Sequence, residues 1–411
     1  MLAKYITALL LVLPPTLGML PTPQVAQRVQ LADPAYIEVV LSKYADLPDA
    51  YTLAQGVSHW KPPDFALQTL ETAGRDGVHL YGPCLGTPEL RTAIKQRLVK
   101  GGLAMSGQEV MVCAGANQAF ATAALCVLDP GDRVLLPKPY YCSHQSALQL
   151  AGASITHIKP DPASLLPCME EMEKEFKRLP APKALIVTTP CNPSGAVYPK
   201  ALIERLVGLC KQHGTWLIID EAYEDFIYDG ESAYSPCSAN LDYEGIIHIW
   251  TMSKAFGMAG WRVGYMLMPQ AISDDMVKIQ DTIPTHACLQ SQRLAAAALT
   301  HSGSDDWVKE RVLSLRESRQ IMWEAVKGTG AVKGNGSFYF LVPLPGKLSE
   351  DDAIDVLARK FGVIVTPGTA FGAPGHARIS YGSQPPKQCK EAADRLKRGL
   401  DYLAFLDTAL T

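Results

Sequence analysis

The sequence predicts an α/β protein, with a large, mainly parallel seven-stranded sheet between helices and a second, smaller α/β domain. From residue 108 onward, short apolar runs alternate with helical patterns, which is typical of a parallel sheet covered on both faces. The chain of 411 residues is also 47% apolar and only 19% charged. This composition supplies a large core and gives no sign of disorder.

The predicted elements follow from these patterns in chain order. The strands of the large sheet are expected at 109–113, 133–136, 154–158, 184–188, 216–219, 246–250 and 262–268. Helices are expected between several of them, at 118–128, 142–151 and 200–212, and a helical pattern runs with interruptions from 281 to about 327. The smaller domain is expected to contain strands at 334–344 and 361–366 and helices at 350–360 and 386–406. We therefore expect a large domain over 51–310, and a small domain built from 21–50 and 311–411.

Residues 1–20 are predicted to form a signal-like or disordered extension. Lys4 precedes an apolar run over 5–13, which Pro14 and Pro15 end. This length suits the apolar region of a signal peptide and is too short to span a membrane, so we expect no stable membrane insertion. The compartment is left open between the cytoplasm and an organellar or secretory route, since no clear cleavage site follows.

Composition and residue spacing exclude several classes of protein. The formal net charge is −3 and no run is rich in Lys or Arg, so a nucleic-acid partner that needs a basic face is not expected. The ten cysteines and nine histidines show neither CxxC pairs nor an HExxH motif. We therefore predict no metal site and interpret the cysteines as free thiols.

Polar residues follow three apolar strands at the ends where the strands finish. ALIVTTP leads into Asn192, WLIID ends at Asp220 with Tyr223 just beyond it, and IIHIWTMS leads into Lys254. In open α/β sheets, ligands bind in the crevice beyond the carboxyl ends of the strands. These four side chains are therefore expected to converge.

Taken singly, each of these residues also has an ordinary structural interpretation. Lys254 fits a surface lysine as well as a carbonyl-binding amine of lowered pKa. Arg262 fits a structural ion pair as well as a phosphate ligand. Asp220 fits a helix N-cap as well as a partner for a pyridinium N–H, and Tyr223 fits simple packing as well as a hydrogen bond to a phenolate oxygen. Asn192 lies in a good turn sequence, NPSG, which does not prevent a ligand contact.

An upstream segment offers a site for an anion. The run VCAGANQ passes from a strand through Gly115, Ala116 and Asn117 into a predicted helix, so free backbone N–H groups and a positive helix end face outward. The pattern is common and weak by itself. It is neither GxGxxG nor GxxxxGK[ST], which argues against the usual dinucleotide and nucleoside triphosphate sites.

Together, seven motifs in register resemble the pyridoxal-phosphate enzymes of fold type I, in the class I/II aminotransferase group. The motifs are YGPCLGTPELR at 81–91, AGANQA at 114–119, PYY at 139–141, NPSG at 192–195, DEAY at 220–223, SKAFGMAGWRVGY at 253–265 and ARISYG at 377–382. Longer phrases, such as LAQGVSHWKPPDFAL at 53–67, are similar to plant-type aminotransferases that act on aromatic amino acids and methionine.

The resemblance implies pyridoxal 5′-phosphate as cofactor and gives roles to the residues around its ring. Lys254 resembles the lysine that forms the Schiff base and then moves the substrate proton. Asp220 is expected to hold the pyridine nitrogen protonated, and Asn192 and Tyr223 to bind the ring oxygen. Tyr141 is expected to stack on the ring face.

It also implies contacts to the phosphate and to the substrate. The phosphate is expected to be held by Gly115, Ala116, Asn117, Thr251 and Arg262. Tyr81 is expected to reach the phosphate of a neighbouring subunit, which implies a homodimer with shared active sites. The α-carboxylate of the substrate is expected to be bound by Arg378, with Gly56 and Asn192 nearby.

The implied reaction moves the α-amino group of an aromatic amino acid or methionine to a 2-oxo acid by a ping-pong mechanism. Some bacterial relatives have Lys where this chain has the neutral Asn117, and His59 and Trp60 are expected to add aromatic surface near the substrate. The same residues also serve C–S β-lyases and aminocyclopropane-carboxylate synthase-like lyases, which we keep as the alternative. A regulator with an N-terminal DNA-binding module is not expected, because only some 25 residues of this sequence precede the family-like region. An inactive homologue fits poorly because the site residues are intact.

Overall fold

The computed structural model describes residues 23–73, 79–237 and 241–409. The expected extension over 1–20 lies outside the described residues. The large sheet contains seven strands, which are β2 (Gln108–Cys113), β3 (Arg133–Pro137), β4 (Ser154–Ile158), β5 (Ala184–Thr188), β6 (Trp216–Asp220), β7 (Ile246–Thr251) and β8 (Gly264–Pro269). The main helices of this region are α5 (Pro88–Lys100), α6 (Ala116–Val127), α7 (Cys142–Leu150), α8 (Met169–Lys177), α9 (Lys200–His213), α11 (Ser273–Thr282) and α12 (Leu289–Thr300).

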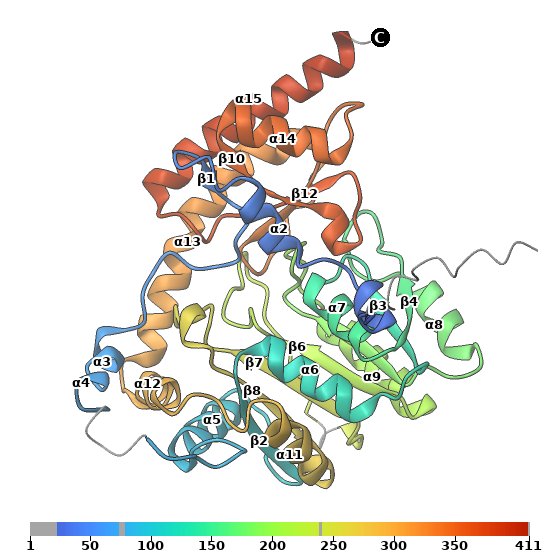
Figure 1. Ribbon diagram of the computed structural model, residues 1–411, viewed down its shortest axis with the longest axis vertical. Coiled ribbons are helices and arrows are strands. Elements are labelled where there is room, and N and C mark those ends of the chain that lie inside the picture. Colours follow the sequence, from blue (N-terminus) through green and yellow to red (C-terminus); the bar gives the residue numbers. More distant parts are fainter. Residues whose placement is uncertain (1–22, 74–78, 238–240, 410–411) are drawn as a thin grey trace, which may run out of the picture.

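The sheet has the strand order β2-β8-β7-β6-β5-β3-β4 (Figure 1). Strands β3 to β7 pair in parallel, whereas β8 runs antiparallel to both β2 and β7. The expectation of a mainly parallel, seven-stranded sheet is therefore confirmed.

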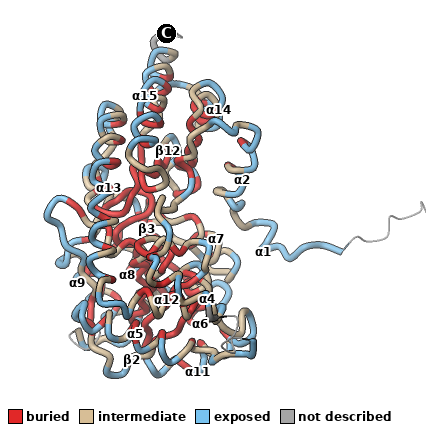
Figure 2. The backbone as a smooth tube through the Cα atoms, turned by 90° about the vertical axis from the view of Figure 1, so that its left-hand side faces the viewer, coloured by how far each residue is buried: buried red, intermediate tan, exposed pale blue. Residues whose placement is uncertain are grey.

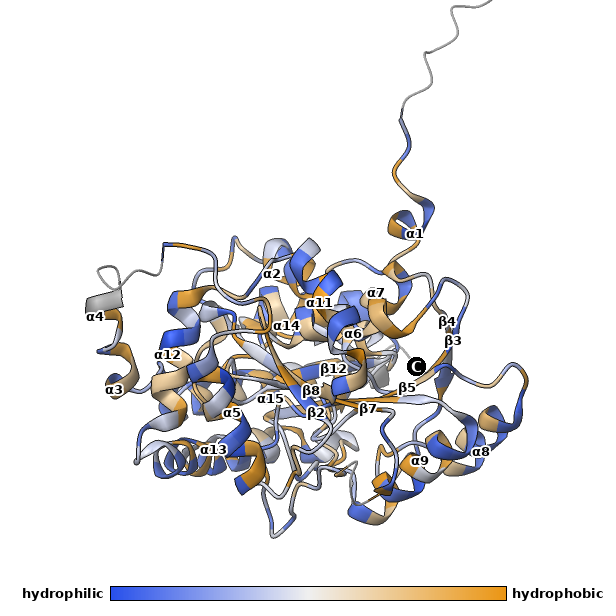
Figure 3. Ribbon diagram, turned by 90° about the horizontal axis from the view of Figure 1, so that it is seen from below, coloured by the Kyte–Doolittle hydropathy of each residue, from blue (hydrophilic) through white to orange (hydrophobic). Residues whose placement is uncertain are grey.

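Helices cover both faces of this sheet (Figure 3). Val134 and Leu136 of β3 pack into the core beneath α6, while Leu135 between them packs into the core beneath α8 and α9. This alternation follows from the two-residue period of a strand. Because both faces are buried, the strands read as continuous apolar runs rather than alternating ones.

A second region of the chain lies above the large sheet in the view of Figure 1. It contains a three-stranded antiparallel sheet in the order β11-β12-β9 and a two-stranded parallel sheet of β1 and β10. Its elements are β1 (Tyr51–Thr52), α13 (Ser304–Val326), β9 (Tyr339–Pro343), α14 (Glu350–Phe361), β10 (Val363–Ile364), β11 (Thr366–Pro367), β12 (His376–Ser380) and α15 (Pro386–Ala409). Buried backbone runs from the large sheet up between α13, α14 and α15 (Figure 2). The division into domains at 51–310 stays a prediction.

Three of the predicted elements differ from those observed. The single strand expected at 361–366 is replaced by the end of α14 and by two short strands, which belong to different sheets. The strand expected at 334–344 forms only over Tyr339–Pro343. The helical pattern from 281 is broken between α11 and α12, where Pro284 and the left-handed Thr285 (φ 62°) turn the chain; proline and left-handed backbone are incompatible with a continuing helix.

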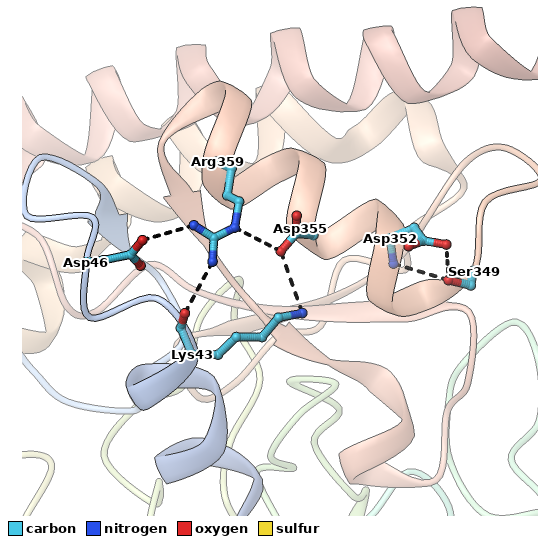
Figure 4. A network of polar contacts seen from close by, with 6 residues as sticks. All are labelled: Lys43, Asp46, Ser349, Asp352, Asp355 and Arg359. Atoms are coloured by element: carbon cyan, nitrogen blue, oxygen red, sulfur yellow. Dashed lines mark hydrogen bonds and ion pairs between the residues drawn. The ribbon is translucent and has the colours of Figure 1, made fainter.

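The N-terminal segment is fastened to the second region by ion pairs (Figure 4). It contains α1 (Gln27–Gln30) and α2 (Tyr36–Lys43), whereas α3 (Asp64–Leu67) and α4 (Leu70–Ala73) follow β1 and pack against α12. Arg359 of α14 binds Asp46 at 3.1 Å and Asp355 at 3.2 Å, and Lys43 reaches Asp355 at 3.6 Å. Exposed pairs of this kind contribute little stability, but they orient α2. Among the described residues, no helix combines the length and apolar character needed to cross a membrane.

Candidate active site

A cavity of about 410 Å³ lies at the carboxyl ends of the central strands. Asp220 is the last residue of β6, Thr251 is the last residue of β7, and Asn192 follows β5 by four residues. Residues 34–38 of the N-terminal segment line its other side. The volume is within the range of small-molecule sites, and the position is the one expected for a ligand in an open α/β sheet.

One end of the cavity is built to receive an anion. Helix α6 begins at Ala116, its N-cap Gly115 has φ 90°, and no side chain caps its first N–H groups. The turn before α6 lies against the start of β8, and glycine is required on both sides of this contact. A Cβ on Gly115 would overlap the guanidinium of Arg262, and one on Gly264 would lie 2.6 Å from the Gly115 carbonyl carbon. The helix N-terminus and the guanidinium therefore face the same space.

Arg262 carries an unneutralised positive charge at this end. Its guanidinium donates to the carbonyl oxygens of Ala259 at 2.9 Å and Ala114 at 3.3 Å. No carboxylate pairs with it within the described part of the chain. Thr251 and Ser253, which share a hydrogen bond of 2.9 Å between their hydroxyls, line the same region.

Asp220 presents a buried carboxylate to the opposite end. Its Oδ2 lies 3.1 Å from Nε2 of His144, and its Oδ1 accepts from the Ala222 N–H at 3.0 Å. The imidazole stacks on Phe120 with the ring centroids 4.1 Å apart, and it lies edge-on to Tyr141 at 5.3 Å. A carboxylate that is 5% exposed and has no full cation of its own suits a ligand N–H.

Lys254 lies between these two ends, three residues beyond β7. Its Nζ donates to the carbonyl oxygen of Gly56 at 2.6 Å. Burial lowers the pKa of the Lys254 amine to about 8, and the positive charges of Arg378 and Arg262 add to this effect against the opposing carboxylate of Asp220. A sizeable fraction of the amine is therefore neutral near neutral pH, as a nucleophile or proton carrier requires.

A closed group of side chains forms the remaining wall. Tyr223 bonds Tyr339 through their hydroxyls at 2.7 Å and accepts from the amide of Asn192 at 3.5 Å. Arg378 Nη1 donates to Asn192 Oδ1 at 3.1 Å, and Nη2 donates to the Ala54 carbonyl. All four side chains are buried.

Arg378 has neither a carboxylate partner for its charge nor a hydrogen-bond partner for its Nε among the described residues. Its side chain is only 2% exposed, and no carboxylate pairs with it among the residues that the structure describes. Its buried Nε likewise has no hydrogen-bond partner among them. An unpaired buried guanidinium is costly, so this wall is suited to an anionic ligand such as a carboxylate.

These groups match the chemistry of pyridoxal 5′-phosphate. The cradle at Gly115 suits a phosphate, the buried Asp220 suits a ring N–H, and the Lys254 amine suits an aldehyde. The donor set therefore fits the cofactor that the sequence resemblance implies.

The structure brings most of the predicted site residues together. Those that line the cavity are Gly56, Ala116, Asn117, Tyr141, Asn192, Asp220, Tyr223, Thr251, Lys254, Arg262 and Arg378. Gly115 caps the helix beside them. Tyr81 does not belong to this cavity: it is 88% exposed, with its ring 6.1 Å from that of His286, and its role toward a second subunit stays a prediction.

The expectation for His59 and Trp60 is wrong. Neither residue lines the cavity. Trp60 donates to the Ala255 carbonyl at 3.0 Å and stacks on Phe226, while the His59 ring contacts the Gly382 carbonyl at 3.3 Å. Both side chains are held by these backbone carbonyls and by apolar packing, away from the cavity.

Sequence reasoning missed several residues that line or support the cavity. Tyr36 and Ile37 of α2, Ser253 and Tyr339 line it, and His144 supports Asp220. His144 had a signal, because it lies three residues after Tyr141 at the start of a helix, so both face the same side. Ser253 begins the motif SKAFGMAGWRVGY but was given no role there, and Tyr36, Ile37 and Tyr339 belong to segments that carry no motif.

Comparisons with known proteins show the family of this chain. The family model "Aminotransferase class I and II" matches residues 49–396. An aromatic aminotransferase (ISS1) of Arabidopsis thaliana is 37% identical over 374 residues, covering 89% of this chain and 93% of that protein. An aspartate aminotransferase of Pyrococcus abyssi is 33% identical over 389 residues, covering 91% of this chain and 98% of that protein. The structure of the aspartate aminotransferase from Thermus thermophilus with maleate superposes with a TM-score of 0.85 at 30% identity, covering 92% of this chain and all of that one.

Proposed function

This chain belongs to the class I and II aminotransferases, and we propose that it moves the α-amino group of an aromatic amino acid or methionine to a 2-oxo acid. The proposed cofactor is pyridoxal 5′-phosphate and the proposed kinetic scheme is ping-pong. The observation that carries the proposal is the convergence on one cavity of a half-buried amine at Lys254, a buried carboxylate at Asp220 and an unpaired guanidinium at Arg378.

Different residues are proposed to hold each functional group of the cofactor. The N–H groups at the start of α6, with Thr251 and Arg262, would hold the phosphate. Asp220 would hold the ring N–H, and Asn192 and Tyr223 the ring oxygen. Tyr141 would cover one face of the ring. When bound, pyridoxal 5′-phosphate supplies a ring that withdraws electrons from the substrate Cα.

The side chains of the protein would then orient the substrate and move its proton. Arg378 would bind the α-carboxylate, and its Nε has no hydrogen-bond partner among the described residues. Lys254, whose pKa is lowered to about 8, would take the proton from the substrate Cα and deliver it to the cofactor carbon that is bonded to the transferred nitrogen. His144 and the Ala222 N–H hold the Asp220 carboxylate in place.

The charge distribution of the cavity supports an uncharged substrate side chain. Its described cationic lining residues are Lys254, Arg262 and Arg378, and each has a role in the reaction as proposed. Beyond them the lining is neutral or acidic, with Asn117 at the start of α6 and Glu38 on α2. A substrate with a second carboxylate would find no cation there and one like charge.

The apolar part of the lining supports the same substrate class. Tyr36, Ile37 and Leu41 of the N-terminal segment line the cavity together with Tyr141. Aromatic and thioether side chains gain free energy on such a surface. The Arabidopsis relative is named as an aromatic aminotransferase, although the Pyrococcus relative is named as an aspartate aminotransferase.

We further propose a homodimer with shared sites. Tyr81 is almost fully exposed, and Leu80 beside it and Ile283 are also exposed. Such a patch is suited to contact with a second copy of the chain. In that arrangement Tyr81 would reach the cofactor phosphate of the partner.

A half-reaction tests the proposal. The visible absorbance of protein loaded with pyridoxal 5′-phosphate is recorded before and after adding Trp, Phe, Tyr, Met, Asp or Glu without an acceptor. We expect aromatic amino acids and Met to remove the visible band most efficiently, and a 2-oxo acid to restore it. Release of ammonia and pyruvate from an added S-substituted cysteine, without an acceptor, would instead identify the C–S β-lyase alternative, and Lys254→Ala provides the inactive control.

A further inference from the structure

Tyr339, on β9, lies at the centre of the site although none of the sequence motifs contains it. Its side chain is 1% exposed and lines the cavity. It contacts three predicted site residues, namely Tyr223, Arg378 and Gly56. A buried tyrosine with these neighbours can influence both the proposed cofactor contacts and the proposed substrate contacts.

The hydroxyl of Tyr339 has one hydrogen-bond partner within the described chain, the hydroxyl of Tyr223 at 2.7 Å. Both hydroxyls keep their protons, because burial raises the pKa of Tyr339 to about 12 and that of Tyr223 well above its usual value. One proton therefore lies between the two oxygens, and the other has to be directed elsewhere.

Two arrangements of these protons are possible, since either hydroxyl could be the donor. If Tyr223 donates to Tyr339, its single proton is not available to the ring oxygen of the proposed cofactor. If Tyr339 donates, Tyr223 accepts both from it and from the Asn192 amide, and the proton of Tyr223 is directed into the cavity. A hydroxyl that accepts a hydrogen bond also becomes a better donor, so the second arrangement favours donation to a ligand.

The ring of Tyr339 has a separate contact. The guanidinium carbon of Arg378 lies 4.6 Å from the centroid of this ring and 4.7 Å from that of Phe371. A cation–π interaction stabilises more when it is shielded from water, as here, than when it is exposed. On the other side, a Cβ on Gly56 would overlap the Tyr339 hydroxyl, so a residue larger than glycine at position 56 would displace it.

We propose that Tyr339 is a positioning residue of the aminotransferase site, whose hydroxyl directs the Tyr223 proton into the cavity and whose ring holds Arg378 for the substrate carboxylate. This inference rests on the proposed function, since it takes Tyr223 as a cofactor contact and Arg378 as a substrate contact. The hydroxyl and the ring should therefore have separable effects.

Two variants and a matched control test this separation. Tyr339→Phe removes the hydroxyl and keeps the ring, whereas Tyr339→Leu removes both. Tyr381→Phe is the control, because Tyr381 is equally buried and donates to the Ser337 carbonyl at 3.1 Å, outside the cavity. For each variant we would measure the pH titration of the visible absorbance of cofactor-loaded protein, the melting temperature, and kcat and KM for Phe.

In Tyr339→Phe we expect the absorbance midpoint to rise by roughly 0.5 to 1 pH unit, because a weaker Tyr223 donor stabilises the deprotonated chromophore less. We expect kcat to fall about 5-fold, with KM within about 2-fold of wild type. In Tyr339→Leu, KM should rise roughly 10-fold as well. Tyr381→Phe should keep the wild-type midpoint and KM.

A wild-type midpoint and kcat in Tyr339→Phe would overturn the inference. So would a loss of activity that follows melting temperature equally in all three variants. Failure of the proposed function gives a different result, since the wild-type protein itself would then exchange no amino group with any donor. The absorbance midpoint needs only bound cofactor and would report on Tyr339 even in that case.

Discussion

His144 Nε2 lies 3.1 Å from Asp220 Oδ2, and the two side chains are 3% and 6% exposed. The remaining carboxylate oxygen accepts from the Ala222 N–H. The carboxylate at the end of β6 is thus oriented by a ring on α7 that does not line the cavity. Its remaining hydrogen-bonding capacity faces the cavity and is left for a ligand. A buried carboxylate held by two hydrogen bonds faces a fixed direction.

The contribution of this contact can be measured with His144→Phe. Phenylalanine keeps the stacking on Phe120 but loses the hydrogen bond to Asp220. We expect cofactor affinity and kcat each to fall roughly 10-fold, as for the loss of one hydrogen bond to a charged group. His144→Gln, which restores a donor, should recover part of the loss. Equal affinities in wild type and His144→Phe would show that Asp220 needs no support from α7.

Substrate choice is expected to depend on the charge at Asn117. In Asn117→Lys, a cation replaces a neutral side chain of the cavity lining, so kcat/KM for Asp should rise roughly 10-fold while that for Phe falls or stays constant. Glu38→Gln is the companion variant: it removes the carboxylate that lines the same cavity and should raise kcat/KM for Asp by a smaller factor. If wild type already prefers Asp to Phe and Met, the proposed substrate class is wrong.

The shared-site proposal predicts complementation between two defective variants. Lys254→Ala should abolish the reaction, and Tyr81→Ala should weaken cofactor binding in the partner's site. When the two proteins are unfolded together and refolded, a mixed dimer has one site with both defects and one site with neither. Random pairing makes half of the dimers mixed, so activity should return to about a quarter of wild type at limiting cofactor.

The separately refolded variants serve as the controls for this experiment. If the mixture has no more activity than the sum of the two controls, Tyr81 acts within its own subunit or not at all. Sedimentation of the wild-type protein would give the oligomeric state independently of any site.

The parts of the site that were predictable from sequence share one physical basis. Asn192, Asp220 and Lys254 all follow runs of apolar residues, and a parallel sheet brings the carboxyl ends of such strands to one edge. The seven-stranded sheet was predictable for the same reason, since fully buried strands read as unbroken apolar runs. Their roles toward a cofactor came from the resemblance rather than from these patterns.

The missed residues depend on contacts between segments far apart in the sequence. Tyr339 lies 116 residues from its partner Tyr223, and its local sequence shows only a buried strand. Trp60 shows the opposite error: it is only four residues from Gly56 in the sequence, but its indole packs against Phe226 and bonds the Ala255 carbonyl. Proximity in sequence therefore predicts little about which face of a loop a side chain occupies.

The pH dependence of Lys254 provides a prediction in which two substitutions act in opposite directions. The pKa of its amine is lowered from 10.5 to about 8, chiefly by burial and then by Arg378, while Asp220 partly opposes the shift. The neutral amine is the form that reacts with an aldehyde. The rate at which cofactor-free protein combines with pyridoxal 5′-phosphate, trapped by borohydride and located by mass spectrometry, should therefore rise with pH and level off above about 8.

Arg378→Met removes a like charge, so the protonated amine becomes less unfavourable and the midpoint of this profile should move to higher pH. Asp220→Asn removes an attractive charge, so the midpoint should move to lower pH. Arg378→Lys keeps the charge and should leave the midpoint close to that of wild type. Because overall loosening of the site would move both variants in the same direction, toward the ordinary lysine value, a rise in the midpoint of Asp220→Asn would contradict the electrostatic account of Lys254.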